Sequence, residues 1–591
     1  MEGSGDGLGA EPSPQIGSHQ MHRLTQILFA LILFAAVHAH AQVVLAVPDS
    51  GWHLWLDRTA RWESDSIFLP ADADLRSLPV HPPTIGWDML ERSPGIVVTL
   101  PSTVEEHHWG ASDFRPYRGE YAYEEEDSIV ENGNYLGVSW WWHDINVPRS
   151  FAGKTVLLGI RGARLRAEVY MNEQLIGYNI ITETAFTCDA SKAVRPGQIN
   201  RIAIRITNPG GRLDWVDTEL LTWGTTKQQF HKSHGFGGLD RGIQLVAHDP
   251  VYFSDLWALN RREPGILRVC GRIMNTTRRA AKGTVRIQLL DPDSGNKARA
   301  TVSQEVELAP THESAFQTEI KFPGAELWSN EHPKLYRVQA HLKQKGTKAK
   351  HPWSDTRELK TGFRWFVADG IGKDAMLRFN GQRIRLTSAI SWGFWGMNGL
   401  WPTRDLAEQE VRSAKTLGLN ALQFHRNIGK AEALDAADRL GLMRYMEPGG
   451  GQTALGDRFL LYSPSPKGPI DDSGRDGDAQ TFSERYMEEK IVRMIRDHRS
   501  HPSLLLYCVQ NEIHPDLRNP RVFHLLRRMH EEDPSRIVVL KSGFPSGNPC
   551  NEAWMEPYSD VVHHDTGDAY CGWWDDHTVG GPGVWRDDLY K

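Results

Sequence analysis

The chain has 591 residues, of which 24% are charged and 40% hydrophobic, and its formal net charge at pH 7 is −7. This length suffices for about three or four globular domains. So small a net charge gives no sign of binding to nucleic acid or to an anionic membrane, and neither partner is expected. The five cysteines are scattered without a CxxC pair, so neither a zinc site nor a disulfide framework is indicated, although an oxidising compartment would allow a Cys550–Cys571 bridge.

Two segments precede the folded domains. Residues 1–20 are rich in glycine, serine and proline and are expected to form a disordered extension. Residues 21–41 combine a short basic start, the apolar run Ile27–Val37 and a small-residue ending, which is the pattern of a secretory signal peptide. We therefore expect a secreted or periplasmic protein whose mature chain begins near Gln42. No later stretch is long and apolar enough to predict a membrane-spanning helix.

Residues 45–250 carry a β pattern. Short β-branched or alternating runs are separated by turns rich in glycine, proline and asparagine, which predicts a jelly-roll sandwich. Asn172-Glu173-Gln174 occupies the place of a hairpin turn. The clearest predicted strands are 140–148, 154–160, 166–171 and 199–206.

A second β segment spans residues 251–365. About seven alternating runs within this length fit an immunoglobulin-like β-sandwich. The clearest of them are 265–271, 283–289 and 336–342.

From residue 366 to residue 591, strands alternate with helices, which predicts a parallel sheet and part of a (β/α)8 TIM barrel. The fold class is therefore multidomain β plus α/β. The predicted strands are 384–390, 421–425, 442–447, 504–509, 537–540 and 560–563. The predicted helices are 403–417, 430–440, one opened by the capping box Thr481 and Glu484, and 520–532.

The strand predicted at residue 504 carries the strongest functional signal. The apolar run Leu504–Val509 is too short for a buried helix, and it ends abruptly in Gln510-Asn511-Glu512. A carboxylate at the end of a buried strand is costly to desolvate, so it needs a reason to be there. On a (β/α)8 barrel that position faces the active-site mouth. The alternative is that Glu512 caps the helix that follows.

Several motifs follow one another in a fixed order over more than 300 residues. They are Ala167–Gly177, similar to AEVYVNGxxxG, Gly237–Gly242, similar to GGIxR, Leu327–Tyr336, similar to LWSPExPxLY, Thr361–Arg364 with Phe379–Gly381, and Arg496–Glu512, similar to RDxxHPS…NE. In this order the chain resembles glycoside hydrolase family 2, which includes β-galactosidases, β-glucuronidases and β-mannosidases. The likeness covers nearly everything after the predicted signal peptide.

The resemblance implies a retaining β-glycosidase that acts on a carbohydrate without a cofactor. Retaining enzymes of this kind use two carboxylates about 5–5.5 Å apart. Glu512 matches the family's general acid/base, and Asn511 matches the residue that holds the 2-hydroxyl of the sugar. His425 and Glu447 match family positions at the ends of the second and third barrel strands.

The chain also departs from the family pattern. Leu386-Thr387-Ser388 stands where the family has LRG, and Leu422–His425 stands where it has VRTSH. An arginine is lost at each place. The arginine support expected around the carboxylates is therefore altered.

The resemblance places the nucleophile, a glutamate, at the end of the seventh strand, but no glutamate follows Glu556. We therefore expect no nucleophile in this chain and a nucleophile beyond residue 591, with the chain being C-terminally truncated. Asp587 or Asp588 as a substitute is the alternative. Six predicted strands leave open sheet edges, so we expect the chain by itself to be inactive and poorly soluble.

Aromatic residues after the predicted strands are candidates for a sugar platform. Trp392 follows the first barrel strand, and Tyr570 and Trp573 follow the sixth. Each is equally typical of packing. His563 and His564 suggest a metal, but neighbouring residues of a strand point to opposite faces, so no metal site is predicted.

Two functions follow from these observations. The first is an exported retaining β-glycosidase with Glu512 as general acid/base. The second is a non-catalytic carbohydrate-binding protein that lacks the nucleophile. The DNA beyond codon 591 separates them, because an in-frame strand ending in glutamate supports the enzyme and a genuine stop supports the binding protein.

Overall fold

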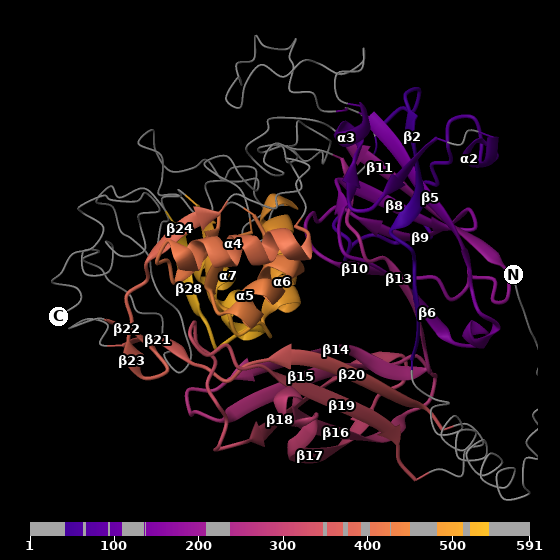
Figure 1. Ribbon diagram of the computed structural model, residues 1–591. Coiled ribbons are helices and arrows are strands. Elements are labelled where there is room, and N and C mark those ends of the chain that lie inside the picture. The colour runs from indigo at the N-terminus through magenta and orange to yellow at the C-terminus, as the bar shows by residue number, and fades with distance from the viewer. Residues whose placement is uncertain are drawn as a thin grey trace, which may run out of the picture. The chain divides into compact units, whose positions relative to one another are not determined.

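The computed structural model describes residues 42–62, 65, 67–92, 95–108, 135, 137–208, 237–346, 352–369, 376–391, 402–425, 427–448, 482–511 and 520–542. All of them belong to one compact unit, Gln42–Lys591. The predicted extension 1–20, signal peptide 21–41 and strand 560–563 lie outside the described residues. Two β-sandwiches and a parallel sheet with helices follow one another along the chain (Figure 1).

The first sandwich consists of two large antiparallel sheets and one small sheet. Their strand orders are β3-β2-β5-β11-β8-β9, β1-β13-β6-β10 and β4-β12-β7. The strands are β1 Val43–Ala46, β2 Ser50–Asp57, β3 Ile96–Thr99, β4 Ser102–Thr103, β5 Gly137–Asn146, β6 Thr155–Ile160, β7 Ala163–Arg164, β8 Arg166–Met171, β9 Gln174–Asn179, β10 Phe186–Asp189, β11 Ile199–Asn208, β12 Gly238–Leu239 and β13 Gln244–His248. The short helices are α2 Met89–Arg92 and α3 Val104–His108.

Side-chain alternation builds the core of this sandwich. Ile202, Ile204 and Ile206 of β11 are buried between the two large sheets. Val156 and Leu158 of β6 belong to the same core. Residues two apart on each strand thus face the opposite sheet, as in other sandwiches.

A tight turn joins β8 and β9. Asn172 and Glu173 have φ angles of 49° and 70°, the left-handed backbone that a two-residue turn between twisted strands requires. The side chain of Asn172 donates to the carbonyl oxygen of Ala193 and to Oδ1 of Asn200, each at 2.8 Å. The hairpin predicted at this turn is confirmed.

The tryptophans of the first sandwich serve packing. Trp52, Trp140 and Trp141 are completely buried. The ring of Trp87 lies 5.5 Å from that of Trp140 and 5.0 Å from that of Tyr170, on the outer side of the six-stranded sheet. In this region the tryptophans therefore contribute to the hydrophobic cores.

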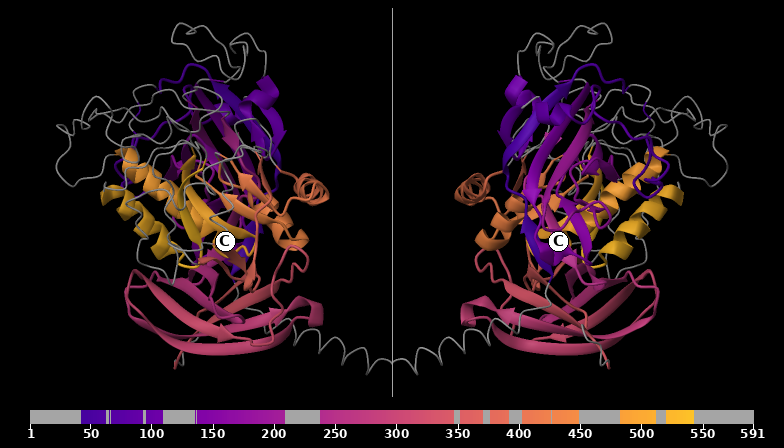
Figure 2. Two further views of the ribbon diagram at one scale, coloured as in Figure 1. Left: turned by 90° about the vertical axis from the view of Figure 1, so that its left-hand side faces the viewer. Right: turned by 90° about the vertical axis from the view of Figure 1, so that its right-hand side faces the viewer.

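The second sandwich pairs the sheet β14-β15-β18 with the sheet β17-β16-β19-β20. Its strands are β14 Val251–Asn260, β15 Ile266–Asn275, β16 Ala281–Asp291, β17 Lys297–Leu308, β18 His312–Lys321, β19 Tyr336–Gln344 and β20 Ser354–Thr361. Figure 2 shows these strands, coloured pink, as two layers. Phe253 and Val269 of one sheet share a core with Ile287, Val338 and Leu342 of the other. The domain limits stay predictions.

The third region contains a small antiparallel sheet and a five-stranded parallel sheet in the order β24-β25-β26-β27-β28. Closure of this sheet into a barrel stays a prediction. The strands are β21 Phe366–Asp369, β22 Met376–Phe379, β23 Gln382–Arg383, β24 Ser388–Ser391, β25 Ala421–Phe424, β26 Met443–Met446, β27 Leu504–Asn511 and β28 Ile537–Ser542. The helices are α4 Arg404–Thr416, α5 Ala431–Leu440, α6 Phe482–His498 and α7 Pro520–Glu532.

The first strand of the parallel sheet differs from its prediction. The sequence predicts a strand over 384–390, whereas β24 begins only at Ser388. The N–H of Ile384 donates to the carbonyl oxygen of Leu377 at 2.9 Å. Ile384 therefore extends the antiparallel sheet of β22 and β23, and the parallel sheet starts later.

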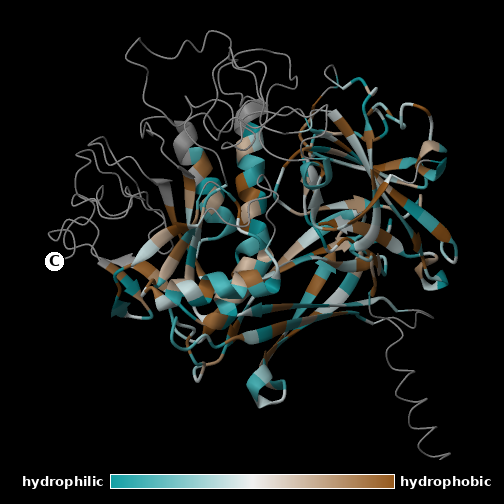
Figure 3. Ribbon diagram, turned by 45° about the horizontal axis from the view of Figure 1, so that its top comes forward, coloured by the Kyte–Doolittle hydropathy of each residue, from teal (hydrophilic) through white to brown (hydrophobic). Residues whose placement is uncertain are grey.

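Helices cover one face of the parallel sheet. Phe424 and Met446 on this face pack with Ile491 of α6, whereas Ala421 on the other face packs with Phe366 of β21. The helices carry both hydrophilic and hydrophobic residues, as amphipathic helices on a sheet do (Figure 3). Among the helices that the structure describes, none is both long and apolar enough to cross a membrane.

Helix α6 also contacts the first sandwich. The hydroxyl of Tyr486 donates to the carbonyl oxygen of Ile180 at 3.3 Å, and Nη1 of Arg493 donates to Oδ1 of Asn179 at 2.8 Å. Ile180 belongs to the hydrophobic core that includes Ile491. The first sandwich and the parallel sheet thus share a core.

Candidate active site

On β25, the side chains that face away from the helices change from apolar to polar toward the carboxyl end. Leu422 and Phe424 pack on the helix side, and Ala421 packs on the other side. Gln423 and His425 share the side of Ala421 by the alternation of the strand. Gln423 and His425 are 0% and 1% exposed. Burying polar side chains is costly unless other polar groups meet them.

Strand β26 shows the same change. Arg444 faces α4, where it pairs with Glu410. Met443 packs on the other side, with Tyr445 partly buried against the same core. Glu447 follows directly after the strand, and its side chain is completely buried.

The polar ends of these two strands meet. Nε2 of Gln423 donates to Oε1 of Glu447 at 3.3 Å, and Nδ1 of His425 lies 3.4 Å from the same oxygen. The side chain of Asn427 donates to the carbonyl oxygen of His425 at 2.8 Å. An amide, an imidazole and a carboxylate therefore converge at the carboxyl edge of the sheet, where the active sites of barrel enzymes lie. The structure brings His425 and Glu447 together, and their contact with a sugar stays a prediction.

Strand β27 continues this edge. Leu506 and Cys508 pack on the side away from the helices, and the strand ends at Asn511, which pairs with Ser542 of β28. Glu512 is the next residue of the chain and lies outside the described residues. Helix α7, the next described helix, begins eight residues later, so Glu512 is not in its first turn.

The remaining predicted site residues are not placed. Trp392, Tyr570 and Trp573, predicted as a sugar platform, lie outside the described residues. Of Asn511 the structure describes the backbone only. Their roles stay predictions.

Gln423 is a site residue that the sequence prediction missed. The comparison with the family motif noted only that an arginine is lost in this segment. The signal for Gln423 is periodicity, because it stands two positions before His425 and therefore on the same face of β25. Its amide now holds the carboxylate of Glu447.

A buried ion pair supports the site from the helix side. Arg444 is completely buried and pairs with Glu410 of α4, which also accepts a hydrogen bond from Ser391. The guanidinium of Arg444 lies 4.5 Å from the ring centre of Phe424. These contacts tie β24, β25 and β26 to α4 directly behind the polar cluster.

The first sandwich reaches the carboxyl edge at the start of α5. Nη1 of Arg161 donates to Oε1 of Glu432 at 2.8 Å. Nζ of Lys430 lies 3.6 Å from Oδ2 of Asp240. Lys430 follows His425 by five positions, so the first sandwich borders the candidate site.

One group of side chains in the first sandwich has the spacing of metal ligands. The ligand atoms of Asp65, His81 and Glu168 lie within 4.8 Å of one another. Arg166 pairs with Glu168, and Arg205 lies 3.1 Å from Asp65. Burial alone would raise the pKa of Glu168, but His81, Arg166 and Arg205 hold it at about 2. Two guanidinium groups already balance the two carboxylates, so the cluster fits an ion-pair network and not a cation site.

A second such group lies beside β27. It consists of Asp435, Asp438 and His501. Oδ2 of Asp438 lies 2.6 Å from Nδ1 of His501, and Oδ1 accepts the N–H of Ser503 at 3.0 Å. Both oxygens of Asp438 thus hold the chain that leads into β27.

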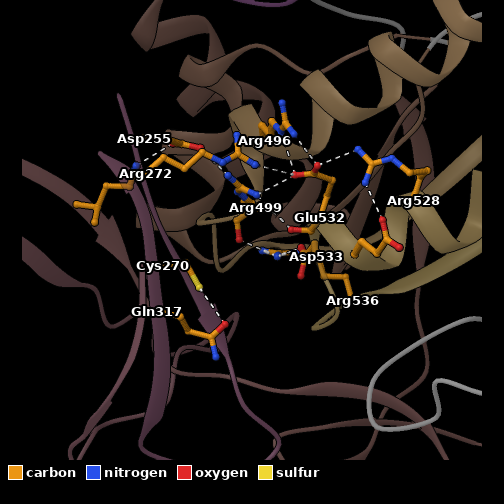
Figure 4. Close-up of polar contacts among 12 residues, drawn as sticks. Asp255, Cys270, Arg272, Gln317, Arg496, Arg499, Arg528, Glu532, Asp533 and Arg536 are labelled. Carbon is orange, nitrogen blue, oxygen red and sulfur yellow. Dashed lines mark hydrogen bonds and ion pairs between the residues drawn. The ribbon is translucent and has the colours of Figure 1, made fainter. Parts of the chain in front are cut away.

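At the amino end of β27, charged side chains join the parallel sheet to the second sandwich (Figure 4). Glu532 accepts hydrogen bonds from Arg496 at 2.7 and 2.9 Å, from Arg499 at 3.2 Å and from Arg528 at 3.1 Å. Arg499 also donates to Asp255 of β14 at 2.6 Å. Burial would raise the pKa of Glu532, but Arg496 and Arg499 hold it below its usual value. The first half of the Arg496–Glu512 motif therefore has a structural role, which is to join the parallel sheet to the second sandwich.

Comparisons with known proteins agree on a family. Residues 251–364 match the family model described as glycosyl hydrolases family 2. A β-glucuronidase from Bacteroides fragilis is 24% identical over 74% of this chain and 57% of its own length. A β-glucuronidase from Formosa agariphila is 22% identical over 73% of this chain and 42% of its own length. The chain thus spans about half the length of these curated relatives.

Solved structures share the fold. A β-glucuronidase from Bacteroides uniformis has a TM-score of 0.57 at 19% identity and covers 85% of this chain and 52% of its own. A β-galacturonidase from Eisenbergiella tayi has a TM-score of 0.57 at 17% identity and covers 85% of this chain and 72% of its own. The family model over residues 251–364, the curated relatives and the shared β-rich multidomain fold all support the resemblance of this chain to glycoside hydrolase family 2.

Proposed function

We propose that the protein is a β-glycosidase that hydrolyses an O-glycosidic bond of a carbohydrate with retention of configuration. One observation carries the proposal: along β25 and β26 the side chains of one face change from apolar to polar and end in the buried pair His425 and Glu447. Packing alone does not require a carboxylate there, because burying it is costly. A sugar hydroxyl, by contrast, needs such acceptors.

In this proposal Glu512 is the general acid/base. It protonates the glycosidic oxygen in the first step and takes a proton from the attacking water in the second. Asn511 holds the 2-hydroxyl of the sugar, and Gln423 keeps the carboxylate of Glu447 in place. The second carboxylate of the retaining mechanism is not assigned to any residue that the structure describes.

The relatives named above suggest the substrate class. Since they are called β-glucuronidases and the structural neighbour β-galacturonidase, we propose a β-linked glycoside, with uronides as the first compounds to test. Trp392, Tyr570 and Trp573 supply its aromatic platform in this proposal. The alternative is a protein that binds the carbohydrate without cleaving it.

A hydrolysis screen tests the proposal. The protein expressed from the complete gene is incubated with aryl β-glucuronides, β-galacturonides, β-galactosides and β-mannosides, and phenol release is followed. Release from at least one compound is expected, with the β-anomer of the sugar appearing first by NMR. An α-anomer appearing first would contradict retention. Saturable sugar binding without release would support the binding protein, and neither binding nor release would contradict both.

Export is a separate proposal, based on residues 21–41. N-terminal sequencing of the protein recovered from outside the cytoplasm is expected to begin near Gln42. A recovered chain that still contains residues 21–41 would contradict cleavage of the signal peptide.

A further inference from the structure

Strand β27 contains an irregularity that decides which of its side chains face the candidate active site. In the pairing with β26, Arg444 is opposite Leu504, but Tyr445 is opposite Leu506, so Leu505 is an extra residue. Such a β-bulge shifts the alternation of the strand beyond it. The core contacts agree, because Leu504 packs on the helix side while both Leu505 and Leu506 pack on the other side.

The bulge has a direct consequence for the far end of the strand. Beyond it, Leu506 and Cys508 face away from the helices and Tyr507 faces them. Leu506 and Cys508 therefore share the sheet face of Ala421, the face on which the candidate site lies. Without the extra residue, alternation from Leu504 would turn the even-numbered positions toward the helices.

The apolar sequence of β27 does not define the bulge. The run Leu504–Val509 is apolar on both faces, as is usual for a buried parallel strand. A slip by one residue exchanges one apolar side chain for another, so burial specifies the register only weakly. Other contacts must hold the bulge in place.

Arg536, between α7 and β28, makes the first set of these contacts. Its guanidinium donates to the carbonyl oxygens of Arg499 and Leu504 at 2.7 Å and of His501 at 2.6 Å. Arg536 is 2% exposed. One buried side chain thus captures three carbonyl groups of the segment that leads into the bulge.

Two further side chains complete the set. Arg364, between β20 and β21, donates to the carbonyl oxygen of Pro502 at 3.0 Å and to that of Leu504. Asp438 of α5 accepts the N–H of Ser503 at 3.0 Å. Arg364 and Asp438 are both buried. We name the three side chains Arg364, Asp438 and Arg536 the register anchor.

We infer that the register anchor positions the face of β27 that borders the proposed active site: by holding the bulge at Leu505, it turns Leu506 and Cys508 away from the helices. The anchor touches main-chain groups at the opposite end of β27, so its members are positioning residues. The effect of the register anchor on catalysis rests on the proposed function. Its effect on the register of β27 does not depend on that function.

Two conservative variants and a matched control test this inference. Arg536→Lys and Arg364→Lys keep the positive charge but lose the forked donors that capture two or three carbonyl groups. Arg528→Lys is the control, because Arg528 lies in the same region but donates to the carboxylates of Glu488, Glu531 and Glu532. Arg364→Lys carries the test even where Arg536→Lys fails to fold through loss of the pairing with Asp533.

The first readout is hydrogen exchange measured by mass spectrometry on peptides that cover residues 504–511. We expect exchange there to be faster by about tenfold or more in the anchor variants, since buried carbonyl groups lose their donors. The second sandwich should exchange as in the wild type, and so should residues 504–511 of Arg528→Lys. Equal exchange in anchor and control variants would overturn the inference.

The second readout is the rate on a phenyl glycoside compared with that on a 2,4-dinitrophenyl glycoside of the same sugar. A misplaced acid slows only the substrate whose leaving group needs a proton, so we expect the anchor variants to lose about tenfold more on the phenyl compound. Equal losses on both compounds would show a structural role only and overturn the positioning. If the wild type cleaves neither compound, the proposed function fails, while hydrogen exchange still decides whether the anchor holds β27.

Discussion

The two ends of the parallel sheet are both rich in buried polar side chains, but they are built differently. At the amino end, charged groups meet opposite charges or carbonyl oxygens: Glu532 accepts hydrogen bonds from three arginines, and Arg536 donates to three carbonyl groups. At the carboxyl end Gln423, His425 and Glu447 meet on one face of the sheet.

Structural polar clusters and a ligand-binding cluster thus differ in how their charges are paired. Buried polarity by itself does not mark a site, because buried charges also tie elements together when they are fully paired. A carboxylate held by an amide and an imidazole, at the edge where barrel enzymes act, is suited to meet a ligand.

Among variants of the residues that the structure describes, the largest effect is expected for Glu447→Gln, which replaces the carboxylate and keeps the shape. We expect kcat/KM on an aryl β-glycoside to fall by about 10²-fold or more, in the range of a positioned catalytic group. The melting temperature should not fall. Glu410→Gln is the matched control on the helix side of the sheet, and it should lower the melting temperature because Arg444 loses its partner. Unchanged kinetics for Glu447→Gln would contradict the assignment of the site.

The next largest effect is expected at the amino end. Glu532→Ala leaves Arg496, Arg499 and Arg528 without a shared carboxylate, and breaking such a buried pair costs about 3–5 kcal/mol of unfolding free energy. Urea unfolding measures it. The neighbouring Glu531→Ala removes an exposed partner of Arg528 and should change stability by less than about 0.5 kcal/mol. Equal effects of the two variants would show that the cluster is not structural.

The ion-pair network around Glu168 in the first sandwich is expected to make the stability of the fold depend on pH in the acid range. Despite burial, His81, Arg166 and Arg205 hold the pKa of Glu168 at about 2, below its unfolded value. The network therefore stabilises the fold fully above about pH 4.5, and this contribution of about 3 kcal/mol is lost as the pH falls toward 2. Thermal unfolding between pH 5 and 2 measures the loss. Glu168→Gln should flatten the slope in this window, and an equally steep slope would contradict the assignment.

In contrast to Glu168, the buried Glu105 has a raised pKa, and the expected effect of its substitution on stability is the smallest of these. Burial raises its pKa to about 8, although the N–H of Tyr135 donates to Oε1 at 2.8 Å. Unfolding then releases a proton between about pH 4.5 and 8, so the buried acid lowers stability increasingly as the pH rises through this window. Glu105→Gln is expected to raise stability at pH 6 by about 1–2 kcal/mol relative to its effect at pH 4.5. A stability difference independent of pH would contradict this account.

Much of the fold could be predicted because its signals are local. Alternating runs mark β8, β11 and β16, and Thr403 caps α4 by accepting the N–H of Leu406 at 3.1 Å. The strand predicted over 384–390 was displaced because Ile384 pairs with Leu377, a contact that the local pattern does not encode.

The candidate site could be predicted only in part. His425 and Glu447 stand at strand ends, which a sequence shows, whereas the role of Gln423 depends on contact between two strands. The register anchor was missed altogether, since Arg364 and Asp438 are distant in sequence from β27. The Arg496–Glu512 motif begins with residues that have a structural role and ends with the proposed catalytic residue. The motif alone therefore does not show which of its residues are structural.

The proposed role of Glu512 as general acid/base is best tested by the leaving-group dependence of Glu512→Gln. We expect kcat/KM to fall by about 10²–10⁴-fold on a phenyl β-glycoside, whose leaving group needs a proton donor. The fall on the 2,4-dinitrophenyl compound should be far smaller, because its leaving group departs without one. Full activity on the phenyl compound would show that Glu512 is not the general acid/base and would contradict the account.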